Sequence, residues 1–162
     1  MMNDILKGKK VLVVDDEPDV SEAIAELLFM CDVTQVATYN DGKKLLEMGA
    51  FDIAILDIMG VQGYKLLDVA NDIGIPAVML TAHAFSVEDT VKSFKSGAVY
   101  FVPKEEMSNI AQILSEIFET LDKAENVFER WLDRFAAFYD TRFGPDWREK
   151  DEKFWSKYKY WM

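Results

Sequence analysis

Cysteine and histidine are the residues that this chain has least of. It holds 1 Cys and 1 His among 162 residues, so no disulfide can close within the chain and no Cys and His cluster can bind a metal. Basic side chains are also few, because 18 Lys and Arg stand against 29 Asp and Glu, a formal net charge of −11. Nonspecific nucleic-acid binding needs a basic surplus, so we expect no nucleic-acid partner.

Long apolar runs are missing as well. No stretch is long enough to span a bilayer, and residues 1–10 lack a signal-peptide pattern, so we expect a cytoplasmic protein. The segment from Trp147 to Trp161 combines aromatic residues with lysines, as a membrane-surface helix does. Its interleaved acidic residues weaken attraction to anionic lipid, so we expect no membrane partner.

What the sequence does have is an alternation of strand and helix patterns between Lys9 and about Leu121. Continuous apolar runs such as 11–14 and 53–56 are typical of parallel strands that are buried on both faces. The segments between them carry apolar residues three and four apart, as amphipathic helices do. The pattern predicts an α/β fold, a doubly wound, flavodoxin-like, five-stranded parallel sheet of order 2-1-3-4-5 with helices on both faces.

Polar side chains follow four of these predicted strands. They are Asp15 with Asp16, then Asp57, Thr81 and Lys104. In the predicted order the first and third strands are neighbours, so their carboxyl ends bring the three aspartates together. Clustered carboxylates tolerate each other when a cation lies between them, and oxygen ligands suit Mg²⁺. A hydroxyl and an ammonium complete the surroundings of a phosphoryl group, so the sequence predicts a phosphorylation site.

These motifs resemble the receiver domain of bacterial two-component response regulators, including chemotaxis receivers, over about residues 8 to 122. The matching stretches are Val13 to Glu17, Leu56-Asp57, Thr81-Ala82, Gly97-Ala98 and Phe101 to Lys104. The resemblance implies that Asp57 is the phosphoacceptor and that the cofactor is Mg²⁺. Its ligands would be Asp16, Asp57, Asp15 through water, and the backbone carbonyl of Met59.

The resemblance also implies a switch around the phosphoryl group. Lys104 would stabilise the phosphoryl oxygens, Thr81 would move to hydrogen-bond one of them, and Phe101 would fill the space that Thr81 leaves. Met59 and His83 each lie two residues after a site residue. They would tune dephosphorylation, Met59 by shielding the acyl phosphate and His83 by orienting water, unless both simply face solvent.

Two stretches depart from the family pattern. Glu105 stands where the family usually has a proline after the lysine. The family usually has a proline four residues after the phosphoacceptor and a glycine eight residues after it. This chain has Val61 and then Gly63, so we expect the loop after Asp57 to be about two residues short. We therefore expect the backbone after Lys104 and after Asp57 to differ from that of the family.

The remaining residues, 123–162, are expected to form a helical extension of a receiver domain spanning residues 1–122. Apolar residues four and three apart predict one helix from about Glu106 to Arg142, followed by a short terminal helix. Such a helix, on the order of 55 Å long, would project beyond its own domain. We expect homodimerisation through an exposed seam, with folding back onto the receiver as the alternative. The seam residues are Phe128, Trp131, Phe135 and Phe138.

The sequence thus favours a stand-alone signalling switch without a substrate of its own. A sensor histidine kinase, a phosphotransfer protein or a small acyl phosphate would phosphorylate Asp57, and the change would alter binding to an unknown downstream protein or dimerisation. One alternative is a dimeric scaffold that works without phosphorylation. Another is a Mg²⁺-dependent phosphohydrolase working through an aspartyl phosphate.

Overall fold

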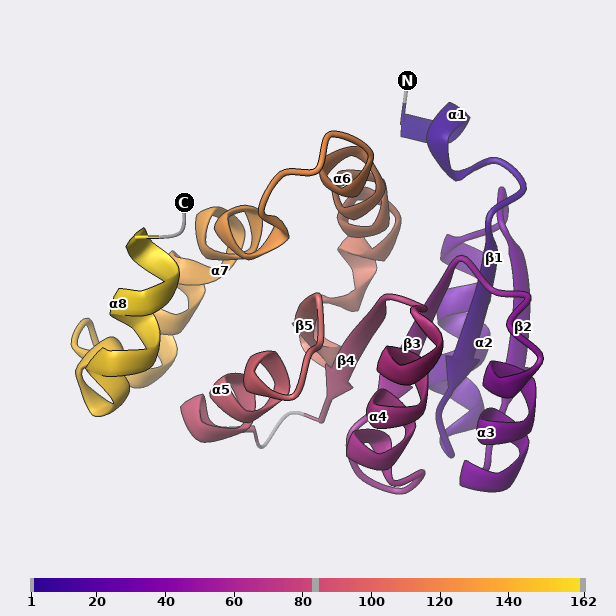
Figure 1. The fold of residues 1–162 in the computed structure, drawn as a ribbon, viewed down its shortest axis with the longest axis horizontal. Helices are drawn as coiled ribbons and strands as arrows, with labels where there is room; N and C mark the ends of the chain where they lie inside the picture. Colours follow the sequence, from indigo (N-terminus) through magenta and orange to yellow (C-terminus); the bar gives the residue numbers. More distant parts are fainter. Residues whose placement is uncertain (1, 83–84, 161–162) are drawn as a thin grey trace.

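The fold is built around one parallel sheet (Figure 1). The computed structural model describes residues 2–82 and 85–160. The strands are β1 (Lys10–Val14), β2 (Asp32–Val36), β3 (Ile53–Asp57), β4 (Ala77–Thr81) and β5 (Tyr100–Pro103). Their order is β2-β1-β3-β4-β5 and all neighbouring pairs are parallel, which confirms the predicted fold class.

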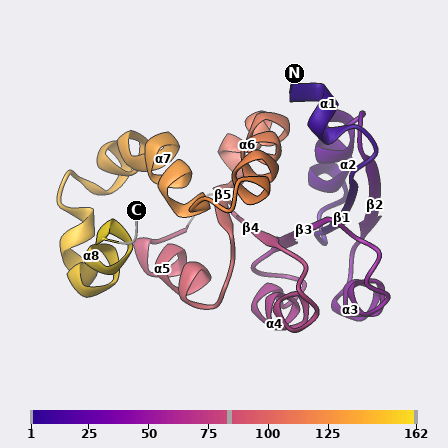
Figure 2. The ribbon, with the colours of Figure 1, turned by 45° about the horizontal axis from the view of Figure 1, so that its top comes forward.

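Helices cover both faces of this sheet. The α-helices are α1 (Met2–Leu6), α2 (Pro18–Leu27), α3 (Tyr39–Glu47), α4 (Gly63–Ile73), α5 (Val87–Lys95), α6 (Ile110–Asp122), α7 (Val127–Phe143) and α8 (Glu152–Tyr160), and the 3₁₀ helices are η1 (Lys104–Asn109) and η2 (Trp147–Asp151). Helices α3, α4 and α5 lie on one side and α2 and α6 on the other, whereas α7 and α8 lie beyond β5 (Figures 1 and 2). Among the described residues, no helix is long and apolar enough to cross a membrane.

Local sequence signals set the starts of the helices that follow the strands. Pro18 opens α2, where its missing N–H costs no hydrogen bond. At the start of α5, Ser86 and Asp89 form a capping box, and each side chain accepts a 3.1 Å hydrogen bond from the other residue's backbone N–H. These starts fix where each loop at the carboxyl edge of the sheet ends, and that edge carries the predicted site.

The two edge strands differ in burial. Strand β2 is only partly covered along its length, as an edge strand usually is, whereas β5 is buried throughout. The cover on β5 comes from α7, whose Trp131 donates an indole N–H to the carbonyl oxygen of Phe101 at 2.8 Å. This bond satisfies a carbonyl on the open edge of the sheet, so the C-terminal helices complete the fold on that side.

The prediction of one continuous helix from Glu106 to Arg142 is wrong. Helix α6 ends at Asp122, and Ala124 has a left-handed φ of 56° that turns the chain. Asn126 then starts α7, its side chain accepting a 2.9 Å hydrogen bond from the N–H of Phe128. An Asn cap offers the new helix a start, and the turn lets the aromatic face of α7 reach the receiver instead of solvent.

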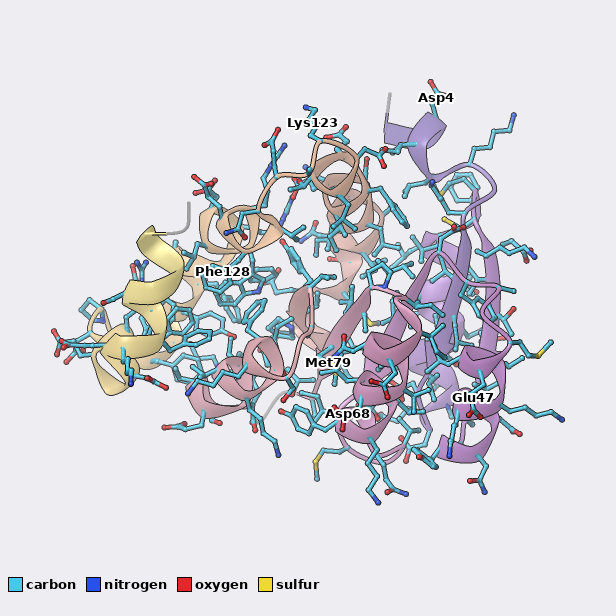
Figure 3. All side chains as sticks on the ribbon, viewed as in Figure 1. Asp4, Glu47, Asp68, Met79, Lys123 and Phe128 are labelled. Carbon is cyan, nitrogen blue, oxygen red and sulfur yellow. The ribbon has the colours of Figure 1, made fainter. Side chains whose placement is uncertain are left out.

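The prediction of an exposed dimer seam is wrong for the same reason. Phe128, Trp131 and Phe135 are buried in their own chain, and Phe138 is half-buried. Their rings contact α5, β5 and α8, with centroid distances of 4.8 Å from Phe94 to Phe128 and 6.0 Å from Tyr100 to Phe135. Phe128 and Met79 lie in the interior, whereas Asp4, Glu47, Asp68 and Lys123 point outward (Figure 3). The extension folds back onto the receiver, the alternative left open by the sequence.

The predicted short terminal helix is present as η2 and α8. Gly144 ends α7 with a φ of 90°, and the chain turns back along that helix. Phe154 and Trp155 of α8 are buried, and Trp155 stacks on Trp131 at 6.2 Å. The terminal helix therefore packs onto α7 through its aromatic side chains.

Candidate functional site

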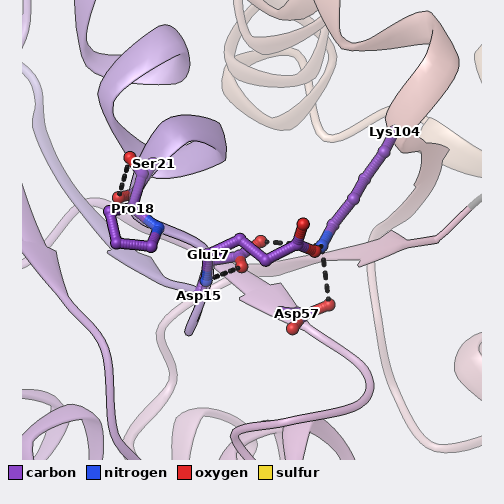
Figure 4. A network of polar contacts seen from close by, with 6 residues as sticks. All are labelled: Asp15, Glu17, Pro18, Ser21, Asp57 and Lys104. Carbon is purple, nitrogen blue, oxygen red and sulfur yellow. Dashed lines mark hydrogen bonds and ion pairs between the residues drawn. The ribbon is translucent and has the colours of Figure 1, made fainter.

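The site lies where β1, β3, β4 and β5 end. Lys104, at the end of β5, reaches across to three carboxylates (Figure 4). Its Nζ lies 3.3 Å from Asp57 Oδ1, 3.1 Å from Asp15 Oδ2 and 2.7 Å from Glu17 Oε1. The predicted acidic residues and the lysine are thus brought together by the parallel order of the strands.

Burial sets the acidity of Asp57. Its side chain is 5% exposed, and burial together with the nearby charge of Asp15 raises its pKa to about 6 despite the opposing charge of Lys104. Burial likewise raises the pKa of Asp15, against hydrogen bonds from the backbone of Glu17 and from Lys104. Two buried carboxylates that share one ammonium are short of positive charge, which is a setting that favours a cation.

Lys104 stays charged in this setting. Burial alone would lower its pKa, but hydrogen bonds to Glu17 and Asp15 and the charges of Asp15 and Asp57 raise it. Glu17 is the partner at the shortest distance, and sequence reasoning quoted it within the acidic motif without giving it a role. Its place directly after the aspartate pair was the only signal for it.

The loop after Asp57 is a tight turn that passes close to both aspartates. The N–H of Val61 bonds to the carbonyl of Met59, and the N–H of Gly63 bonds to the carbonyl of Ile58. A Cβ at Gly60 would lie 2.4 Å from Asp16 Oδ2, and one at Gly63 would lie 2.3 Å from the carbonyl oxygen of Asp57. At Gly63 the backbone leaves no room for a side chain, whereas at Gly60, with a φ of 60°, a Cβ would have to displace the carboxylate of Asp16.

The acidic residues fit a divalent cation. Carboxylate oxygens of Asp15, Asp16 and Glu17 lie within 4.8 Å of one another. Asp15 Oδ2 is buried, and the ammonium of Lys104 lies 3.1 Å from it. Asp16 is exposed and does not cap α2, because Glu17 is the N-cap residue and makes no side-chain cap bond. An all-oxygen set with an open side suits Mg²⁺.

Thr81 and Phe101 occupy neighbouring strands beside the acidic residues. Thr81 ends β4 and is 5% exposed, and the N–H of Ile58 bonds to the carbonyl of Leu80 at 3.0 Å, which ties the ends of β3 and β4 together. Phe101 is fully buried, and its ring centroid lies 5.7 Å from that of Phe85. The predicted switch residues therefore lie on neighbouring strands, Thr81 at the end of β4 and Phe101 within β5.

Of the two residues predicted to tune dephosphorylation, the structure describes only Met59. Met59 is 72% exposed beside Asp57, so its side chain is open to solvent. His83 lies outside the described residues. The role predicted for the pair stays a prediction.

Sequence reasoning missed the polar and aromatic link between this site and α7. Arg142 Nη1 bonds to Glu105 Oε1 at 2.5 Å, and its guanidinium lies 4.6 Å from the ring centroid of Phe85. Glu105 stood out in the sequence only as a departure from the family pattern. No sequence signal paired it with Arg142, because the pairing depends on the turn between α6 and α7.

Comparison with known proteins agrees with the geometry. The family model described as "Response regulator receiver domain" matches residues 11–117. The chain is 32% identical over 114 residues to the two-component response regulator ARR18 of Arabidopsis thaliana, and 38% identical over 99 residues to the heme response regulator HssR of Staphylococcus aureus. These matches cover 64% and 57% of the chain but only 18% and 43% of the relatives, so the chain matches less than half of either relative.

Solved structures share the fold. A CheY-like response regulator receiver domain protein from Methanospirillum hungatei superposes with a TM-score of 0.65 and 25% identity over 73% of this chain and 99% of that one. A structure described as a putative response regulator from Chloroflexus aurantiacus superposes with a TM-score of 0.61 and 22% identity over 70% of this chain and 99% of that one. The family match spans more than half of the sequence and includes the strand ends that carry the three aspartates, Thr81 and Lys104. The chain belongs to the response regulator receiver domain family.

Proposed function

We propose that this protein is a signalling switch in which Asp57 accepts a phosphoryl group. The observation that carries the proposal is the position of Lys104. One ammonium contacts Asp57 and Asp15 at 3.3 and 3.1 Å at the ends of β1, β3 and β5. Receiver domains are signalling switches, not enzymes with an external substrate, and the response regulator family works with histidine kinases or phosphotransfer proteins.

The transfer needs an ionised Asp57. With a pKa of about 6, most of the carboxylate is ionised at neutral pH, and its burial keeps water away from the product. A carboxylate oxygen forms a bond to phosphorus while the bond from phosphorus to the histidine nitrogen, or to the oxygen of a small acyl phosphate, breaks. Lys104 then donates hydrogen bonds to the phosphoryl oxygens from the position that it already holds.

Bound Mg²⁺ would offset the negative charge of the phosphoryl oxygens. Asp15, Asp16 and Asp57 would hold it, with the backbone carbonyl of Met59 as the expected further ligand and Glu17 within reach of the same cluster. The burial of Asp15 Oδ2, which has one ammonium as its neighbour, supports this assignment. Before the cation binds, Lys104 holds Asp15, Glu17 and Asp57 of this set.

Output would pass through Thr81 and Phe101. Thr81 would hydrogen-bond the new phosphoryl group, and Phe101 would follow it, as the family resemblance implies. Phe101 packs on Phe85, and its carbonyl oxygen accepts the bond from Trp131, so a shift there reaches the C-terminal helices. We propose that phosphorylation changes the partner binding of this region. The burial of the expected dimer seam removes the support for a change in dimerisation through it.

Intact-mass spectrometry tests the proposal directly. Wild type and Asp57→Asn are incubated with acetyl phosphate, each with Mg²⁺ and with EDTA. We expect one phosphate adduct on wild type with Mg²⁺ only. An adduct of equal yield on Asp57→Asn would rule out Asp57 as the acceptor, and no adduct from acetyl phosphate or from a phosphorylated histidine phosphotransfer protein would overturn the switch.

A further inference from the structure

The residue after the site lysine is tied to the C-terminal helix. Lys104 ends in the acidic cluster, and Glu105, the next residue, forms an ion pair with Arg142 near the end of α7. Adjacent Cα atoms are held about 3.8 Å apart by a planar peptide, so a displacement of Glu105 also displaces the backbone of Lys104. The position of α7 therefore bears on the lysine that contacts Asp57.

The other restraints on this stretch are the ion pairs of Lys104 and the contacts of η1 with α2, α6 and β5. Lys104 and Glu105 open η1, none of whose residues is buried. The N-cap residue of η1 is Pro103, and it makes no side-chain cap bond. Because η1 has neither a buried side chain nor a side-chain cap, the ion pair is one of the tertiary contacts that hold its first turn.

Arg142 is itself held in place on two sides. Its guanidinium lies 4.6 Å from the ring centroid of Phe85, which is 6% exposed, and 6.0 Å from that of Phe143. The side chains of Arg142 and Glu105 are 23% and 30% exposed, so the pair is partly shielded from solvent. A planar guanidinium stacked on a buried ring is already oriented for its carboxylate, which lowers the entropy cost of the pair.

We propose that Arg142 is a positioning residue for Lys104, acting through Glu105. The ion pair fixes the first turn of η1 so that the ammonium meets Asp57, and phosphoryl acceptance then depends on α7 being seated on β5 and α5. This inference rests on the proposed function of Asp57. It assigns a role to Glu105, the residue that replaces the family's usual proline, and to the C-terminal extension.

The test compares four variants of the full chain with wild type. Arg142→Gln and Glu105→Gln each remove the ion pair from one side, and Arg142→Lys keeps its charge. Arg148→Gln is the control, because Arg148 also stacks on a ring of the extension, 5.0 Å from the centroid of Trp147, and is exposed. Phosphorylation by acetyl phosphate with Mg²⁺ is followed by intact mass, and backbone protection in 104–109 and 127–143 by hydrogen exchange.

We expect both Gln variants to slow phosphorylation by roughly tenfold and to lower protection in 104–109 while 127–143 stays protected. Arg142→Lys should stay within about threefold of wild type, and Arg148→Gln within about twofold. Unchanged rates in both Gln variants would overturn the proposal, whether or not protection in 104–109 falls. Loss of protection in 127–143 in both would also overturn it, because the pair would then hold α7 and not η1.

The exchange measurement separates this proposal from the proposed function. If wild type takes no phosphate from any donor, the function of Asp57 fails. The inference that the ion pair positions the backbone at Lys104 then still holds if protection in 104–109 falls in the Gln variants and is kept in Arg142→Lys. It fails if protection there is unchanged.

Discussion

The sheet and the C-terminal helices bury different kinds of side chain. The central strands are filled by Val, Ile, Leu and Ala, which are buried along β1, β3 and β4. Beyond β5 the interior is aromatic, with ring contacts that run from Phe85 through Tyr139 and Trp131 to Trp155. Branched aliphatic residues suit a regular pleated surface, whereas large rings fill the irregular space between helices that cross beside a sheet edge.

This difference shows how an open sheet can be closed on one side only. At the β2 edge the strand stays partly exposed, and at the β5 edge Trp131 covers the strand and bonds to its backbone. The buried aromatic residues of α7 and α8 thus belong to the same hydrophobic cluster as the sheet residues. Four substitutions test how far the two regions act as one.

The largest effect is expected from Trp131→Ala. Removing a fully buried indole leaves a large cavity and an unpaired carbonyl at Phe101, at a cost of about 3 to 5 kcal/mol in the free energy of unfolding. If the aromatic region is the less stable part, hydrogen exchange will show lost protection in α7 and α8 while β1 and β3 keep theirs. Leu56→Ala in β3 is the matched control and should weaken the whole chain. Equal losses in all elements for Trp131→Ala would show a single cooperative core.

Asp57→Asn should stabilise the sheet region in a pH-dependent way. The folded pKa of Asp57, about 6, is above the ordinary 3.8, so the native state resists ionisation and the wild type loses stability as pH rises from about 4 to above 6. Without Mg²⁺ we expect Asp57→Asn to gain about 2 to 3 kcal/mol relative to wild type at pH 8 and little at pH 4. Urea unfolding at both pH values measures this. Asp68→Asn on the exposed face of α4 is the control, and an equal gain there would contradict the burial argument.

Gly60→Ala should affect the cation site more than the fold. Gly60 and Gly49 both have left-handed φ values, 60° and 69°, so alanine at either costs about 1 to 2 kcal/mol of backbone strain. Only at Gly60 would the new Cβ meet a carboxylate, that of Asp16, whereas Gly49 has open space. We expect calorimetry to show roughly tenfold weaker Mg²⁺ binding in Gly60→Ala and unchanged binding in Gly49→Ala. Equal affinities would mean that the loop does not shape the site.

The smallest effect is expected from Tyr139→Phe. The Tyr139 hydroxyl makes a 2.6 Å hydrogen bond with Thr90 between α7 and α5, and Thr90 keeps a second bond to the carbonyl of Ser86. Loss of the first bond should cost about 1 kcal/mol in urea unfolding, because the ring contacts stay. A cost as large as that of Trp131→Ala would show that the aromatic region depends on this polar contact and not on packing.

Sequence reasoning reached the sheet and most of the site because both depend on local patterns. Apolar runs identify buried parallel strands, and the side chains that follow them must meet at one edge once the strand order is given. Asp15, Asp57 and Lys104 are found together for this reason. The roles of Glu17 and Glu105 were not readable, because each depends on which side chain lies opposite in space.

The extension shows where a periodic pattern misleads. Apolar residues four and three apart describe a helix face but do not say whether the helix is interrupted. One residue, Ala124, takes a left-handed conformation, and Asn126 starts a new helix after it. The free energy gained by burying Phe128 and Trp131 against α5 and β5 exceeds the cost of that break. This gain depends on tertiary contacts, so local residue preferences do not reveal it.

The sequence alone therefore determined the fold class, the strand order and the meeting of Asp15, Asp57 and Lys104 at the ends of the strands. The physical reason is that alternating patterns and strand-end side chains are local features of the sequence. A parallel sheet then places the side chains at the strand ends close together in space. The tertiary structure alone decided that the aromatic helices close the β5 edge and that Arg142 reaches Glu105 beside the site. Those contacts join residues 30 or more positions apart, and they form only after α7 turns back and buries its rings.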